Sequence, residues 1–165
     1  MHLIALLPLF FAVGHWKHPR TAEAATIIRA SGPTCWNDDY HFEPTVFREC
    51  MEIISNDIGR GYDIDEPFKF SFDPSFQPDI RLPKYWTRIG LNCGVGVDLA
   101  PGLEGYDRTT LRDIKAAALA VAIECVIKPP HVGGYVQLGW HHKLGVLISG
   151  RRTDVSTRRN STALH

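Results

Sequence analysis

The chain has 165 residues, of which 44% are hydrophobic and 22% are charged, a composition typical of a globular protein. This length is enough for one domain with a proper core and too short for two domains of typical size. The 18 basic and 18 acidic side chains balance, so no overall basic field draws the chain to nucleic acid or to an anionic membrane.

An uncharged apolar run extends from Leu3 to Val13. Its length matches the hydrophobic region of a signal peptide and is too short for a bilayer, which takes roughly 20 helical residues to cross. Small residues fit cleavage before His15, with a second candidate site before Ala25. We expect a signal peptide at 1–14, a flexible or processed lead-in at 15–34, and no membrane span. The alternative is a buried N-terminal helix or strand.

The chain contains four cysteines: Cys35, Cys50, Cys93 and Cys125. An even number of cysteines in an exported chain indicates two disulfides. None of them forms a C-x-x-C pair, so a zinc knuckle and a thioredoxin-like motif have no support. The alternative is four free, buried thiols in a cytosolic protein.

The first predicted helix begins at Glu43-Pro44-Thr45 and ends near Gly59, with Cys50 in its apolar stripe. The segment PFKFSF that follows, at 67–72, places three phenylalanines on one face against Lys69 and a serine. This alternation predicts a half-buried strand. Prolines on both sides of it predict that the rest of the segment from Gly59 to Pro83 is a loop.

The stretch LNCGVGVDL, at 91–99, alternates five apolar residues with polar residues and glycines, which predicts a strand. Gly94 and Gly96 then belong to the other face of the strand, where they let a neighbour pack closely. The alternative is a dinucleotide-binding loop. That motif needs a third glycine, and Leu99 occupies its position.

Thr110 and Asp113 resemble a capping box before the alanine-rich segment 111–127, which predicts a second helix with Cys125 on its buried face. We expect Cys50 and Cys125 to be bridged, because both lie on the sheet-facing stripes of neighbouring helices. That pairing leaves Cys35 to bond Cys93.

The segment 134–149 predicts a β-hairpin with a turn near His141-His142. The tail at 151–165 has no hydrophobic pattern, is basic and is expected to be disordered. It contains a formal glycosylation acceptor at Asn160. Together the elements predict a single α+β domain at 35–150: an antiparallel sheet of about four strands, two helices on one face, and the order helix, strand, strand, helix, strand, strand.

Trp140, His141 and His142 at the predicted hairpin tip form a possible contact surface. Adjacent strand histidines point to opposite faces, so metal binding by this pair is disfavoured. The alternative function is a small hydrolase that combines loop carboxylates at 63–66 with a hairpin histidine. Cys93, placed in a strand, is a poor candidate for a nucleophile.

The segments RECMEII, LPKYWTRIGLNCGVGVDL, ECVI and GGYVQLGWHHKLGVLISG together resemble small secreted cysteine-containing proteins of filamentous fungi. Many members of that group are candidate effectors, and some share a killer-toxin-like α/β sandwich. The resemblance covers about Cys35 to Ser149 and carries over no catalytic residue. It implies a disulfide-stabilised extracellular protein that acts at a host surface or on a competing microbe. We expect a monomer without a cofactor whose partner is an extracellular protein or glycan.

Overall fold

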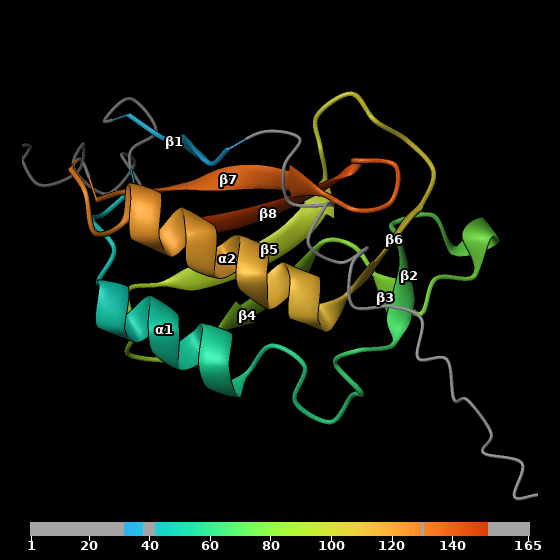
Figure 1. The fold of residues 1–165 in the computed structure, drawn as a ribbon, viewed down its shortest axis with the longest axis horizontal. Coiled ribbons are helices and arrows are strands. Elements are labelled where there is room, and N and C mark those ends of the chain that lie inside the picture. Colours follow the sequence, from blue (N-terminus) through green and yellow to red (C-terminus); the bar gives the residue numbers. More distant parts are fainter. Residues whose placement is uncertain (1–31, 38–41, 130, 152–165) are drawn as a thin grey trace, which may run out of the picture.

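The computed structural model of the chain describes residues 32–37, 42–129 and 131–151 (Figure 1). It has an α+β architecture, with a five-stranded antiparallel sheet, two helices on one face of that sheet, and a three-stranded mixed sheet beyond one end. The predicted signal peptide, most of the lead-in, the tail beyond Arg151 and Asn160 lie outside the described residues. The elements, in chain order, are β1 (Thr34–Cys35), α1 (Phe47–Asn56), β2 (Pro67–Ser71), the 3₁₀-helix η3 (Pro74–Phe76), β3 (Ile80–Arg81), β4 (Lys84–Thr87), β5 (Gly94–Leu99), β6 (Asp107–Thr110), α2 (Leu111–Cys125), β7 (Gly133–Leu138) and β8 (Leu144–Ser149).

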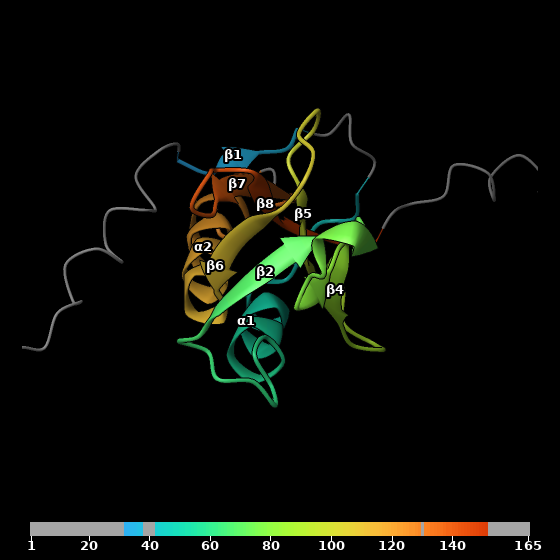
Figure 2. The same ribbon diagram turned by 90° about the vertical axis from the view of Figure 1, so that its right-hand side faces the viewer.

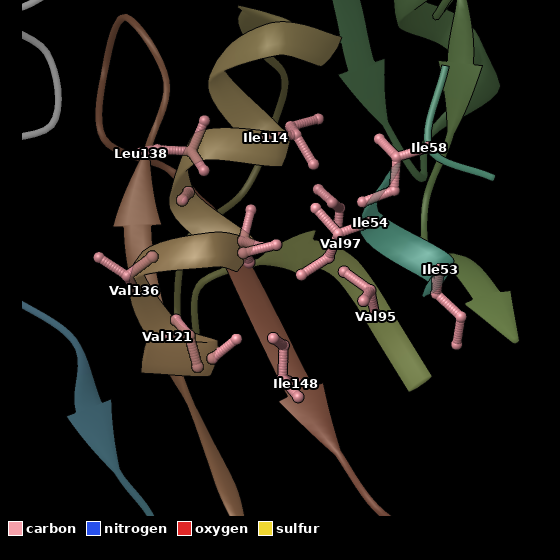
Figure 3. Packing of buried hydrophobic residues seen from close by; sticks show 14 of the residues in the cluster. Ile53, Ile54, Ile58, Val95, Val97, Ile114, Val121, Val136, Leu138 and Ile148 are labelled. Carbon is pink, nitrogen blue, oxygen red and sulfur yellow. The ribbon is translucent and has the colours of Figure 1, made fainter. Parts of the chain in front are cut away.

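The large sheet has the strand order β1-β7-β8-β5-β4, and every neighbouring pair is antiparallel. The predicted hairpin is confirmed as β7 and β8. The sheet has five strands where about four were expected. The edge strands β1 and β4 were not predicted, and the predicted strand at 67–72 lies in the small sheet instead. The helix-facing side chains of β5, β7 and β8 alternate with outward-facing residues and form the core with both helices (Figure 3). They are Val95, Val97, Val136, Leu138, Leu144, Val146 and Ile148.

Both helices bury the stripes that the sequence predicts. In α2 the buried residues include Ile114, Ala118, Val121 and Cys125, and its capping box is present. In α1 they are Cys50, Ile53 and Ile54.

The start of α1 was predicted too early, because the helix begins at Phe47 rather than at 43–45. Both the backbone N–H and the hydroxyl of Thr45 donate to the backbone carbonyl of His131 at 2.7 Å. These long-range hydrogen bonds hold Thr45 outside the helix.

The glycines of β5 lie on the sheet face that no helix covers. A Cβ atom at Gly96 would lie 2.7 Å from the ring of Tyr85, so the ring packs directly on the glycine backbone. Across the strands the register places Tyr135, Leu147, Gly96 and Tyr85 in one row. The interpretation of these glycines as the outer face of a strand is therefore confirmed, and Gly94 is the first residue of β5 rather than part of a loop before a helix.

The small sheet has the order β3-β2-β6 and lies beyond the end of the large one (Figures 1 and 2). The strand predicted from PFKFSF is confirmed as β2. Its partners β3, which is parallel to it, and β6, which is antiparallel to it, were not predicted. They are two and four residues long and carry no alternating hydrophobic pattern.

The structure contains two disulfides, as expected, but the predicted pairing is wrong. The bonds are Cys35–Cys125 and Cys50–Cys93, with Cα–Cα distances of 5.1 and 5.3 Å. Each bond joins a helix to the sheet layer, not one helix to the other. Cys125 at the end of α2 is bonded to β1, and Cys50 of α1 is bonded to the residue just before β5.

The antiparallel arrangement of the helices explains this pairing (Figure 1). The Lys115 side chain of α2 donates to the Ser55 backbone carbonyl of α1. Along the helices, Cys50 lies five residues and Cys125 ten residues from this contact. At 1.5 Å per residue the two cysteines are offset by about 8 Å along the axes, which exceeds the Cα separation that a disulfide spans.

Candidate binding surface at the hairpin end

The turn between β7 and β8 carries Trp140, His141 and His142, all of them exposed. The carboxylate of Asp107 in β6 fixes this turn from inside. Asp107 is fully buried and accepts hydrogen bonds from the backbone N–H groups of His141 at 3.0 Å and Lys143 at 2.8 Å. The predicted contact residues therefore lie on a turn that is anchored to the small sheet.

Next to this turn, two cations lie opposite each other in the small sheet, where Lys69 of β2 pairs with Arg108 of β6. The N–H and C=O of Lys69 are both hydrogen-bonded to Asp79, and the C=O of Arg108 accepts the N–H of Trp140. Both backbones thus direct their polar groups away from each other. This is the non-hydrogen-bonded type of antiparallel pair, in which the Cα atoms are only about 4.5 Å apart and the side chains are close.

Aromatic rings flank the two cations. The Lys69 ammonium lies 5.5 Å from the ring centre of Tyr106, and the Arg108 guanidinium lies 5.9 Å from that of Trp140. The rings of Tyr106 and Phe76 are 5.5 Å apart. We call these five residues the hairpin-end surface. Its rings remain open to solvent, with exposed fractions of 51% for Trp140 and 37% for Tyr106 and Phe76.

Neither cation of the hairpin-end surface forms an ion pair with a carboxylate of the described residues. The Lys69 ammonium donates to the backbone carbonyl of Phe76 at 3.1 Å. The Asp79 carboxylate lies nearby, where it accepts the backbone N–H of Lys69 at 2.7 Å. The Asp107 carboxylate is buried and accepts backbone N–H groups, and it forms no ion pair with either cation.

The structure does not bring together the groups of the hydrolase hypothesis. The 63–66 loop directly precedes the end of the small sheet where Pro67 pairs with Thr110. The backbone N–H of His141 donates to Asp107, which lies at the other end, where Phe70 pairs with Asp107. Three strand residues separate these ends, which is roughly 10 Å.

The loop carboxylate that forms an ion pair is also unsuited to act as a general acid. Asp65 is ion-paired with Arg112, whose hydrogen bond lowers the pKa of Asp65. A general acid needs a raised pKa.

Other parts of the described chain line cavities, and the three considered next contain none of residues 63–66, 141 or 142. Two are on the open face of the large sheet. One of about 360 Å³ is lined by Trp36, Tyr135, Leu147 and Asp98 among others, and one of about 300 Å³ lies beside Tyr85. The third, of about 220 Å³, lies between the end of α1 and β4.

Within 32–37, 42–129 and 131–151, no three His, Cys, Asp or Glu side chains form a group that could hold a metal ion. Within the same ranges, no helix has the length and apolar character needed to cross a membrane.

No protein-family model, curated protein or solved structure matches this chain. Its function therefore has to be inferred from its own geometry.

The sequence singled out Trp140 but not Lys69 or Arg108. The alternation in PFKFSF already places Lys69 on the outer face, but Arg108 lies in a strand without a pattern.

Proposed function

We propose that the chain is a secreted, disulfide-stabilised protein that binds an extracellular protein or glycan through the hairpin-end surface. The observation that carries this proposal is the pair formed by Lys69 and Arg108. Like charges directly opposite each other on neighbouring strands destabilise a sheet. A protein that keeps such a pair without an ion pair in its described residues, and places exposed aromatic rings beside it, presents a surface suited to a ligand rather than to its own stability.

The compartment is supported by the two disulfides and by the N-terminal sequence. Disulfides persist in oxidising environments and are rare in the cytosol. The apolar run from Leu3 to Val13 has the length of a signal-peptide core. The resemblance to small secreted proteins of filamentous fungi supports an action at a host surface or on a competing microbe.

Secretion can be tested by expressing the full chain in a fungal secretory host. We expect soluble protein in the medium whose N-terminus, read by mass spectrometry, is His15 or Ala25. Intact Met1 on protein that remains in the cytosol would contradict this part of the proposal.

Binding can be tested with the purified, oxidised protein, labelled and incubated with isolated fungal and plant cell walls. We expect Trp140→Ala to reduce the bound fraction strongly. The matched control is Tyr85→Ala, which removes an exposed aromatic ring, 54% accessible, from the open face of the large sheet. If Tyr85→Ala abolished binding and Trp140→Ala did not, the site would be on the open face and the proposal would be wrong.

A further inference from the structure

From the chemistry of the hairpin-end surface, we infer that its ligand is an acidic polysaccharide, that is, a chain of sugars carrying carboxylate or sulfate groups. This inference rests on the proposed function and names the ligand class of the same site. A ligand must match two features at once: a close pair of cations and the exposed aromatic rings beside them.

The cation pair favours a ligand that carries acidic groups. Arg108 offers a planar fork that binds a carboxylate or sulfate through two parallel hydrogen bonds, and Lys69 adds a compact point charge beside it. Because the two residues are a non-hydrogen-bonded pair, both charges lie within reach of one acidic group or of two neighbouring ones. A bound acid would remove the repulsion that the free protein carries.

The aromatic rings favour a ligand that has a flat, weakly polar face next to each acidic group. The face of an aromatic ring is electron-rich, and the C–H groups on the face of a sugar ring are slightly positive, so the two stack. The Trp140 ring lies beside the Arg108 guanidinium, and the Tyr106 ring lies beside the Lys69 ammonium. Each cation thus has an aromatic ring next to it, which suits a polymer that carries sugar faces close to its acidic groups.

A third cation lies on the neighbouring strand. Arg81 of β3 is the register partner of Ser71, a buried residue two positions along β2 from Lys69. Arg81 is exposed and has no ion pair within the described residues. Each of the three strands of the small sheet thus carries a cation without an ion pair in the described residues, which suits an extended polymer better than a single small anion.

Single-stranded nucleic acid also combines charge with stacking faces, so it is the ligand class to exclude. Nucleic-acid-binding domains are typically basic overall, and this chain has a formal net charge of zero. The disulfides also point to a compartment in which polysaccharides are the abundant polymers.

The test measures binding of the oxidised protein to five probes by titration calorimetry: heparin, polygalacturonate, dextran, polyphosphate and a single-stranded oligothymidine. We expect binding to heparin, to polygalacturonate or to both, and none to dextran. Which of the first two binds tells sulfate from carboxylate as the recognised group. Tighter binding to oligothymidine than to either acidic glycan, or equal binding to dextran, would overturn the inference.

Variants separate recognition at this surface from a general charge effect. Lys69→Gln/Arg108→Gln should weaken glycan binding about tenfold or more. The control Arg48→Gln/Lys128→Gln removes the same two charges from helix-side positions and should change it less than about twofold. Trp140→Ala should weaken binding to the glycan but not to polyphosphate, which has no ring to stack. Equal losses in both double variants would show a non-specific field and overturn the inference.

Competition distinguishes failure of this inference from failure of the proposed function. If Trp140→Ala abolishes cell-wall binding but acidic glycans neither bind nor compete, the surface is a binding site for another ligand and only the inference falls. If Trp140→Ala leaves cell-wall binding unchanged, both fall.

Discussion

Asp107 is fully buried, and its carboxylate accepts hydrogen bonds from three backbone N–H groups, those of Arg108, His141 and Lys143. These bonds connect β6 to the hairpin turn and hold Arg108 and Trp140 in place. Loss of the negative charge therefore weakens three partly buried hydrogen bonds at once, and hydrogen bonds to charged groups are the stronger ones.

We expect Asp107→Asn, which keeps the size of the side chain, to lower the free energy of unfolding by about 2 kcal/mol. Chemical denaturation of the oxidised protein measures this. The control is Asp63→Asn, because Asp63 is an exposed carboxylate that accepts a single backbone N–H, and its effect should stay within about 0.5 kcal/mol. An Asp107 effect no larger than the control would show that the turn does not depend on this carboxylate.

Gly134 marks the closest approach between the large sheet and the Cys35–Cys125 disulfide. A Cβ atom there would lie 2.4 Å from the Thr34 carbonyl oxygen and 2.9 Å from the Cys125 sulfur. Gly145 on the neighbouring strand β8 is a matched contrast. A Cβ atom added there would have no neighbour closer than 3.9 Å.

Gly134→Ala should therefore lower the unfolding free energy by about 1 to 3 kcal/mol through overpacking. Gly145→Ala should leave it unchanged or raise it by up to about 1 kcal/mol, since glycine weakens a strand interior. Thermal unfolding of the two variants checks the order, and equal melting temperatures would contradict it.

At the scale of the elements, α1 is tied to the loop after β4 by an ion-pair cluster. The Arg88 guanidinium donates to both oxygens of Asp57, at 2.7 and 2.8 Å, and also to Glu52. The hydrogen bonds from Arg88 hold the pKa of Asp57 below its ordinary value, against the opposing effect of burial. This contribution to stability is complete above the ordinary aspartate pKa, near ~3.9, and is lost as the pH falls through the lowered value.

Replacing Arg88 should remove that pH-dependent contribution. We expect the stability difference between the parent protein and Arg88→Met to be largest above about pH 4 and to shrink at lower pH. Arg48→Met, which removes an exposed arginine of α1 with no ion pair in the described part of the chain, serves as the control. Denaturation across the acid range provides the measurement, and a difference that did not vary with pH would argue against the assignment.

The elements differ in how far the sequence predicts them. The core of α1, together with α2, β2, β5, β7 and β8, follows from local periodicity, because each buries one face against the common core. The short strands β1, β3, β4 and β6 have two to four residues, and long-range partners decide their pairing. The same holds for the candidate site. Trp140 can be identified from the local sequence, whereas the pairing of Lys69 with Arg108 depends on the long-range pairing of β6 with β2.

At the scale of the whole molecule, the two disulfides join the helical layer to the sheet at two separate places. The bonded cysteines are 90 residues apart in Cys35–Cys125 and 43 in Cys50–Cys93. The chain-entropy estimate assigns each bond about 4 to 5 kcal/mol, a large part of the stability of a typical domain. The predicted disulfide pairing was wrong because it required the relative position of the two helices. Local sequence patterns do not define that position.

Non-reducing peptide mapping should find peptides that link Cys35 to Cys125 and Cys50 to Cys93. Replacing either pair by alanine should lower the melting temperature strongly, because the unfolded chain gains conformational freedom. A peptide linking Cys50 to Cys125 would contradict the structure.

The position of β1 has a consequence for self-association. It is a two-residue edge strand with the register Thr34↔Tyr135 and Cys35↔Gly134, and it covers this part of the outer edge of β7. So few hydrogen bonds hold a strand weakly, and the bond to Cys125 keeps it in register. Once that bond is reduced, the N–H and C=O groups of β7 become an open sheet edge, and such an edge pairs readily with another chain. The oxidation state of one cysteine pair would then decide whether this protein stays a separate molecule or begins to assemble strand by strand.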